Sequence, residues 1–479
     1  MPRKCQSLAT GAIFKLASVD GEARQHQIRM RGSRLLLIGA VAETVRITRA
    51  AGPDFEAELA KLLSDNALII TPTSPHFGEF IERYSFNNSP DYSVVVIVDT
   101  EDDVSPSSSV TGHGPWGGLS TLKDGMSIWL RYLSRIGLTP DGQYVHIGGG
   151  LRVNELVRTL CSARKQTVCW RCWLQLGRCV GLFMGEYGLG LDQIVSARVV
   201  LANGTAVTVS DDSHSDLFWG LKGAGHNFGR VTELKLRVYD NIGKADWAFA
   251  LLIFTHAELE ALFDLLNAKN ADQPSHLSFD AIILLRVFSN GFSVAQMETY
   301  IEPFQALSPL LVSTIAADYP SLIETLEYGV DSATCTPNHY GSIFSTGTKM
   351  SVPSDMRNFY NIFNAATSEI PEFAISYVFI ESYAVQAMQA VPATRSTAYA
   401  HRHLRALFPE LDALVDEWGE KMRSALLEHQ PRQESYVNYS VKQESRQAMY
   451  EYCDSRLSKL RRIKNKYDPH DSSGFYVPI

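Results

Sequence analysis

The spacing of apolar and polar residues predicts short strands and helices along most of the chain. Apolar runs that are rich in β-branched residues or alternate with polar ones predict strands, whereas apolar residues recurring every three to four positions predict helices. In the first half the predicted strands are 94–98, 144–147, 194–201, 206–209 and 231–238. The helices predicted there are 56–66, 153–160 and a short helix that begins at Asp216 after a cap at Ser213 or Ser215.

Asn203 and Gly204 separate two of these strands. Asn-Gly is the favoured pair for a two-residue hairpin turn, because both central positions of that turn have positive φ. We therefore expect strands 194–201 and 206–209 to pair antiparallel through a tight turn.

The predicted elements become longer after about residue 242. Helical patterns lie at 257–268 and 411–427, and strand patterns lie at 279–287 and 374–380. This mixture predicts a second domain of the α+β class. The last segment begins with a strand at 436–439 and continues as a long helix at 445–466, which ends before Asp468-Pro469.

The composition is that of an ordinary soluble protein. The chain has 479 residues, of which 45% are hydrophobic and 20% charged, and this length fits about two to four domains. A net charge of −8 argues against nucleic-acid binding through the overall charge. No apolar run approaches the roughly 18 residues of a membrane span, and no signal peptide is recognisable. We therefore expect a soluble protein without a membrane partner and leave its compartment and oligomeric state open.

Two common enzyme classes lack their motifs. Gly148-Gly149-Gly150 follows a predicted strand as a dinucleotide-binding turn would, but Val153 occupies the position of the third glycine and no acidic residue follows at the required distance. No G-x-S-x-G sequence supports a serine hydrolase.

Cysteines and one histidine form two candidate clusters. His113 lies between Gly112 and Gly114, where the backbone is free to approach a bulky flat ligand closely, although a histidine in an ordinary turn is the alternative. Cys169, Cys172 and Cys179 supply only three of the four ligands that a structural zinc site needs. The seven cysteines of the chain also form no disulfide framework.

Two further clusters are dense in glycine or in aromatic residues. The motif Y-G-L-x-x-D begins at Tyr187, D-L-F-W begins at Asp216, and G-H-N-F-G begins at Gly225. Glycines between a strand and a helix let main-chain N–H groups face an anionic ligand such as a pyrophosphate. The fourth cluster is Y-V-N-Y at Tyr436, followed by a basic helix and K-Y-D-P at Lys466.

In this order the clusters resemble the berberine-bridge-enzyme-like FAD-linked oxidoreductases of the vanillyl-alcohol-oxidase / p-cresol-methylhydroxylase superfamily. The resemblance extends from about Pro53 to the C-terminus and is most specific between Tyr187 and Val238. It implies an α+β fold with a two-lobed FAD-binding domain of the p-cresol-methylhydroxylase type and a substrate domain with a seven-stranded antiparallel sheet covered by helices. The expected parts are a poorly ordered arm at 1–52, a first FAD-binding segment at 53–240, the substrate domain at 241–430 and a C-terminal segment at 431–479 that returns to the FAD-binding domain.

The resemblance also implies the chemistry. A small organic substrate, such as a secondary-metabolite intermediate, transfers a hydride to flavin N5, a side-chain base removes a proton, and dioxygen reoxidises the flavin. The candidates for the base are Tyr383, Glu381 and Tyr439, with His401 as a further one. His113 is implied as the covalent attachment to the flavin and Cys172 as a second attachment, with Cys179 as the alternative. The other implied contacts to FAD are Gly112, Gly114, Tyr187, Gly188, Asn227, Phe228, Gly229, Tyr436 and Asn438.

The sequence departs from this family at four places. A helix and a strand expected before His113 are missing, and residues 169–181 carry tryptophans and arginines where small residues are expected. Arg230 replaces an aliphatic residue, and an unpaired buried arginine is costly. Helix-like sequence follows 401–403 where the family has a strand. These departures leave two alternatives: an error of the gene model over 104–112 and 169–181, or a non-catalytic flavoprotein fold that has lost FAD.

Overall fold

The protein is described here by a computed structural model. All elements below lie within Thr44–Ile479. The residues described are 53–83, 89–104, 116–168, 180–241, 246–325, 341–342, 344, 346–371, 373, 378, 380–392, 397–404, 406–408, 411–412, 416–437, 440, 444–450, 454–474 and 476–479. The arm predicted at 1–52 lies outside them. No helix within these ranges is both long and apolar enough to cross a membrane.

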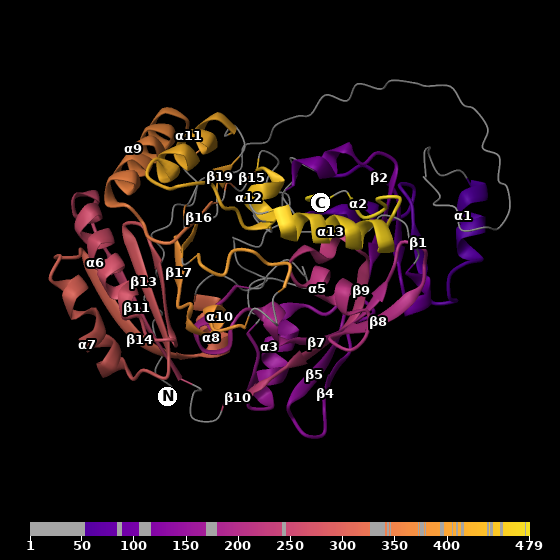
Figure 1. Ribbon diagram of the computed structural model, residues 1–479, viewed down its shortest axis with the longest axis horizontal. Helices are drawn as coiled ribbons and strands as arrows, with labels where there is room; N and C mark the ends of the chain where they lie inside the picture. The colour runs from indigo at the N-terminus through magenta and orange to yellow at the C-terminus, as the bar shows by residue number, and fades with distance from the viewer. Residues whose placement is uncertain are drawn as a thin grey trace, which may run out of the picture. The chain divides into compact units, whose positions relative to one another are not determined.

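A five-stranded antiparallel sheet contains most of the strands predicted in the first half of the chain (Figure 1). Its order is β4 (Ile136–Leu138), β5 (Tyr144–Gly148), β9 (Arg230–Arg237), β7 (Ile194–Val200) and β8 (Ala206–Ser210). Because β5 is antiparallel to both of its neighbours, the glycines at 148–150 do not end a parallel Rossmann strand, in agreement with the sequence.

The hairpin between β7 and β8 forms as predicted, but its turn is longer. Val200 pairs with Ala206, so the connection consists of residues 201–205. Gly204 has a φ of 81°, whereas Asn203 accepts a hydrogen bond from the backbone N–H of Thr205 through its side chain. The expected two-residue turn is therefore wrong, because the Asn side chain stabilises a wider loop.

A small sheet lies at the start of the described chain. Its order is β1 (Leu68–Ile70), β2 (Tyr92–Ile97) and β3 (Gly125–Trp129), with β2 and β3 parallel. Strand β2 confirms the apolar run predicted at 94–98. Helix α1 (Pro53–Ala60) contributes Leu59 to the core of this sheet and ends before the predicted boundary at residue 66. The short helix α2 (Phe77–Ile81) follows β1.

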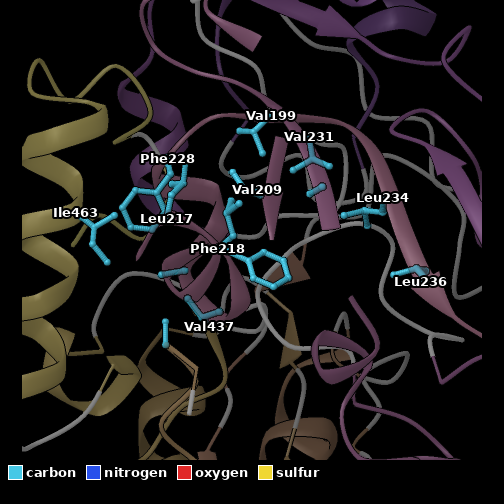
Figure 2. Close-up of a cluster of buried hydrophobic side chains, with 14 of the residues drawn as sticks. Val199, Val209, Leu217, Phe218, Phe228, Val231, Leu234, Leu236, Val437 and Ile463 are labelled. Carbon is cyan, nitrogen blue, oxygen red and sulfur yellow. The ribbon is translucent and has the colours of Figure 1, made fainter. Parts of the chain in front are cut away.

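The core of the five-stranded sheet also contains residues from the C-terminal part of the chain. Leu217 and Phe218 of α5 (Ser215–Ala224), Phe228, and Ile463 of α13 (Asp454–Tyr467) lie in one apolar cluster (Figure 2). Val437 belongs to the same cluster.

Helix α3 (Val153–Ser162) forms as predicted. The N-cap of α5 is His214, which has a φ of 47° and makes no side-chain cap bond, so the expected serine cap is wrong.

The second large sheet has seven strands, all antiparallel (Figure 1). Its order is β14 (Leu311–Asp318), β11 (Asp246–Ile253), β13 (Leu284–Asn290), β12 (Leu277–Ala281), β17 (Glu381–Tyr383), β18 (Ala406–Phe408) and β16 (Thr346–Thr348). Residues of four helices share one apolar core with this sheet, which confirms the implied α+β architecture. The helices are α6 (Leu259–Ala271), α7 (Val294–Gln305), α9 (Pro353–Glu369) and α11 (Asp416–Leu427).

Several predicted boundaries in this half are wrong. The single strand predicted at 279–287 is the hairpin of β12 and β13, because both halves are apolar and the turn between them carries no Gly or Pro signal. The helix predicted at 411–427 begins at Asp416, and Leu411–Asp412 forms β19. Strand β18 follows residues 401–403, so the helix-like sequence expected there is also wrong. Most of the strand predicted at 374–380 lies outside the described residues.

The remaining elements are short. Strand β6 (Lys165–Gln166) pairs with β10 (Tyr239–Asp240), and β15 (Gly341–Ser342) pairs with β19. The other helices are α4 (Met184–Tyr187), α8 (Tyr319–Thr325), α10 (Gln386–Gln389), α12 (Arg446–Tyr450), η1 (Glu101–Asp103), η2 (Gly117–Thr121), η3 (Gly190–Gln193), η4 (Gly225–Asn227) and η5 (His256–Glu258). The long helix predicted at 445–466 is therefore described as two helices, α12 and α13. Tyr436 is in no strand, contrary to the prediction for 436–439, and residues 438–439 are outside the described ranges.

Candidate functional site

The two faces of the seven-stranded sheet differ in chemistry. Successive residues of a strand point to opposite faces. Phe279 and Val287 face the helices, whereas Phe288 and Tyr383 belong to a separate cluster on the other face. Alternation places Asp280, Arg286 and Glu381 on this second face as well.

Aromatic residues from several segments meet on that second face. Tyr383, Tyr399 and Tyr436 are all less than 5% exposed and belong to one apolar cluster, and the partly buried Tyr187 and Tyr239 pack against that cluster. We call these five residues the tyrosine cluster. It brings together a base candidate of the seven-stranded sheet, Tyr383, with two residues implied to contact FAD, Tyr187 and Tyr436.

Gly185 allows Tyr187 to reach this cluster. A Cβ atom at Gly185 would lie 2.2 Å from the carbonyl oxygen of Ser275 and 2.4 Å from Cβ of Ala384, the residue directly after β17. Only a glycine permits this approach of α4 to the end of β17. The ring of Tyr187 then stacks on Tyr239, with ring centroids 3.9 Å apart.

Gly188 and Asp192 complete the turn after Tyr187. Gly188 has a φ of 84°, a conformation that favours glycine, and the backbone N–H of Leu189 donates to Oδ2 of Asp192. Both carboxylate oxygens of Asp192 also accept hydrogen bonds from Arg402. The Y-G-L-x-x-D motif is thus fixed to the segment that carries Tyr399.

Three acidic and basic residues form a buried row beside the tyrosine cluster. In register, Asp280 lies opposite Arg286 on one side and Glu381 on the other. Nη2 of Arg286 is 2.9 Å from Oδ2 of Asp280, and Glu381 is fully buried. This row places charged groups beside buried aromatic side chains, which is an arrangement that can orient a ligand in a binding site.

Asn227, Phe228 and Gly229 lie elsewhere, in the core between β9 and the C-terminus. Nδ2 of Asn227 is 3.2 Å from the hydroxyl of Tyr450, and Lys464 donates to the main-chain oxygen of Asn227. Oδ1 of Asn227 is buried and has no hydrogen-bond partner among the described residues. Phe228 packs against Gly220 in the core of Figure 2. The structure therefore does not bring these three residues to the tyrosine cluster.

The remaining site predictions fall outside the described residues. These are Gly112, His113, Gly114, Cys172, Cys179, Asn438 and Tyr439. Val168 and Val180, which precede and follow the segment with the cysteines, are both buried in the same apolar cluster as Tyr383.

Sequence reasoning missed Asp280, Arg286 and the role of Arg402. A charged residue in a run that otherwise predicts a buried strand is a usable signal, and both Asp280 and Arg286 meet it.

Arg230, expected to be costly if unpaired, has partners: its Nη1 lies 3.2 Å from Oγ of Ser473. Burial lowers the pKa of Arg230 to about 10, and the nearby Asp468 opposes that shift.

The tyrosine cluster and the charged row fit an isoalloxazine and its substrate. A flat ring system needs aromatic and apolar contacts on its faces, and its nitrogen and carbonyl edge needs hydrogen-bonding groups. Tyr187, Tyr383 and Tyr436 offer both an aromatic ring and a hydroxyl.

No family model matches the chain, but similar proteins and solved structures are known. It is 31% identical over 468 residues to the FAD-linked oxidoreductase anuG of Penicillium roqueforti, covering 88% of this chain and 91% of that protein. It is 29% identical over 515 residues to the FAD-linked oxidoreductase chry5 of Gibberella zeae, covering 95% and 100%.

Solved structures show the same fold. The xylooligosaccharide oxidase from Myceliophthora thermophila C1 matches with a TM-score of 0.75 at 18% identity, covering 88% of this chain and 98% of that one. BBE-like 1 of Physcomitrella patens matches with a TM-score of 0.74 at 18% identity, covering 87% and 97%. The chain therefore belongs to the FAD-linked oxidoreductases, its cofactor is FAD, and it shares its fold with a BBE-like protein.

Proposed function

We propose that this oxidoreductase oxidises a small organic substrate and uses dioxygen as the final electron acceptor. FAD, when bound, supplies the acceptor for the hydride and transfers the electrons onward. The observation that carries the proposal is the tyrosine cluster, which places Tyr383, Tyr187 and Tyr436 in one apolar cluster. The relatives are oxidoreductases over nearly the whole chain, which does not favour a fold that has lost its activity.

We assign proton abstraction to β17. Glu381 and Tyr383 lie two residues apart on one strand and share the face that carries the tyrosine cluster. Glu381 offers a carboxylate and Tyr383 a phenolic oxygen as the proton acceptor. Asp280 lies opposite Glu381 and forms an ion pair with Arg286. The guanidinium of Arg286 therefore balances the negative charge of Asp280 next to the proposed proton acceptor. Tyr439 remains a third candidate on sequence grounds.

The substrate class follows from the mixture of groups on this face. Aromatic rings favour a flat or apolar ligand surface, and the charged row of Asp280, Arg286 and Glu381 favours hydroxyl groups on that ligand. A hydroxylated small molecule, such as a secondary-metabolite intermediate, meets both requirements. Two of the similar structures are oxidases of hydroxyl-rich oligosaccharides.

We also propose covalent attachment of the flavin at His113 and Cys172, with Gly112, Gly114, Tyr187, Gly188, Tyr436 and Asn438 as further contacts. This proposal keeps Asn227, Phe228 and Gly229 only as residues near a part of FAD that lies away from the isoalloxazine ring. One similar structure, the glucooligosaccharide oxidase from Acremonium strictum, is described with a 6-S-cysteinyl, 8α-N1-histidyl FAD. We propose in addition that residues 53–240 and 431–479 form the FAD-binding domain and that residues 241–430 form the substrate domain.

The test is to purify the protein, precipitate it with acid and measure where the flavin absorbance remains. We expect a yellow protein whose flavin stays in the pellet, and release of the flavin into the supernatant after His113→Ala is combined with Cys172→Ala. A candidate substrate should then yield hydrogen peroxide and consume dioxygen in equal amounts. A stable, colourless protein would contradict the proposal and support the non-catalytic alternative.

A further inference from the structure

His401, His403 and Glu434 converge on one point of the structure. Nδ1 of His401 lies 3.3 Å from Oε2 of Glu434, and Nε2 of His403 lies 2.5 Å from the same oxygen. The three ligand atoms are all within 4.8 Å of one another. The side chains of His401 and Glu434 are 2% and 6% exposed, whereas that of His403 is 35% exposed.

The hydrogen bond between His401 and Met449 fixes which ring nitrogen of His401 faces the cluster. Nε2 of His401 lies 3.0 Å from the main-chain oxygen of Met449, and a carbonyl oxygen can only accept. Nε2 therefore carries a proton, and Nδ1 is the ring nitrogen that faces Oε2 of Glu434. A histidine held in this way by a backbone carbonyl has the orientation found in metal ligands.

Glu434 is fixed in a similar manner. Its main-chain oxygen accepts from the backbone N–H of Gly347 on β16, and Oε1 accepts from Nε of Arg432 at 2.6 Å. Oε2 is the oxygen that both histidines approach. Two imidazole nitrogens and one carboxylate oxygen thus meet at a single point.

We propose that His401, His403 and Glu434 bind a divalent transition-metal cation, with Zn²⁺ as the best match. Zinc takes nitrogen and oxygen ligands at about 2.0–2.2 Å in a tetrahedron, which separates neighbouring ligand atoms by roughly 3.3 Å. The separation of His401 and Glu434 already has this value. The more exposed His403 has room to withdraw from its present contact, and a water molecule completes the tetrahedron.

The cation joins two segments that each carry a residue of the tyrosine cluster. Tyr399 donates from its hydroxyl to the main-chain oxygen of His401, and Tyr436 follows Glu434 by two residues. The site is therefore structural. It does not depend on the proposed oxidation, and it assigns His401 to the cation rather than to proton abstraction, because both of its ring nitrogens are engaged.

A second cluster of the described chain serves as an internal control. Asp355, Glu428 and His429 also lie close enough together to hold a cation, but the side chain of His429 is 58% exposed. An adventitious zinc ion would bind such an exposed histidine as readily as it binds His403.

The experiment titrates the chelator-treated full-length protein with Zn²⁺ by isothermal titration calorimetry. We expect one ion per chain, affinity weakened by more than about tenfold in His403→Ala, and unchanged affinity in His429→Ala. Glu434→Gln, which keeps the size of the side chain, should weaken binding in the same direction, with circular dichroism confirming the fold. The absence of one-to-one binding, equal affinity in His403→Ala, or loss of binding in His429→Ala would each overturn the proposal.

Discussion

Arg402 and Asp192 form a two-point ion pair across 210 residues of sequence. Nη1 of Arg402 lies 2.8 Å from Oδ2 of Asp192, and Nη2 lies 2.6 Å from Oδ1. Their side chains are only 17% and 13% exposed. The pair fixes the Y-G-L-x-x-D motif to the segment with Tyr399, so it sets the spacing within the tyrosine cluster.

Removing one partner of this pair should destabilise the protein. Arg402→Ala leaves the carboxylate of Asp192 without its guanidinium, and breaking a buried pair in this way costs about 3 kcal/mol. We expect a lower midpoint of urea unfolding and weaker retention of flavin. The matched control is Lys421→Ala, which breaks the exposed pair with Glu417 and should change the stability little. Equal effects of the two substitutions would contradict the role of Arg402.

The second prediction concerns Gly185. In Gly185→Ala the new methyl group would lie 2.2 Å from the Ser275 carbonyl oxygen, so α4 must move away from β17. Such overpacking costs about 1–3 kcal/mol, and Tyr187 moves with the helix. Gly78→Ala is the matched control, because nothing lies within 4 Å of a Cβ atom there. Thermal unfolding and flavin content of both variants measure the effect, and a neutral Gly185→Ala would refute the close approach.

The third prediction separates the two base candidates on β17. If Glu381 accepts the proton, Glu381→Gln lowers kcat by about 10²- to 10⁴-fold while the protein stays yellow, and Tyr383→Phe has the smaller effect. If Tyr383 is the base, the order reverses. Ser382→Ala is the control, since Ser382 lies on the opposite face of the strand and bonds to Asn270. Full activity in both Glu381→Gln and Tyr383→Phe would remove β17 from the proposed chemistry.

Sequence reasoning identified the fold, its site residues remain a proposal, and the misses have physical causes. Motifs such as Y-G-L-x-x-D are local, so Tyr187 and Gly188 could be named without a structure. The Arg402–Asp192 pair and the row of Asp280, Arg286 and Glu381 depend on pairing between strands distant in sequence, which no local pattern encodes. The apolar pattern predicts a single strand where the hairpin of β12 and β13 forms, because the turn between them lacks Gly, Pro, Asn and Asp.

Asp103 also illustrates a contact that sequence spacing does not show. Its carboxylate accepts hydrogen bonds from Ser64, 39 residues away, and from Thr100. Burial alone would raise the pKa of Asp103, but these hydrogen bonds outweigh burial and hold the pKa below its usual range. The charged form is thus the one that the folded protein stabilises.

The last prediction is a pH dependence of stability that arises from Asp103. A carboxyl group whose pKa is lower in the folded protein stabilises it fully above the unfolded pKa of about 3.9. That stabilisation is lost as the pH falls from this value through the lower, folded pKa, because the proton then binds the unfolded chain more readily. Asp103→Asn should therefore destabilise the protein near neutral pH and flatten the acid limb of its urea-midpoint profile. Asp65→Asn, at an exposed neighbouring position, should leave that limb unchanged. An acid limb of equal slope in wild type and Asp103→Asn would assign the acid sensitivity to other carboxylates.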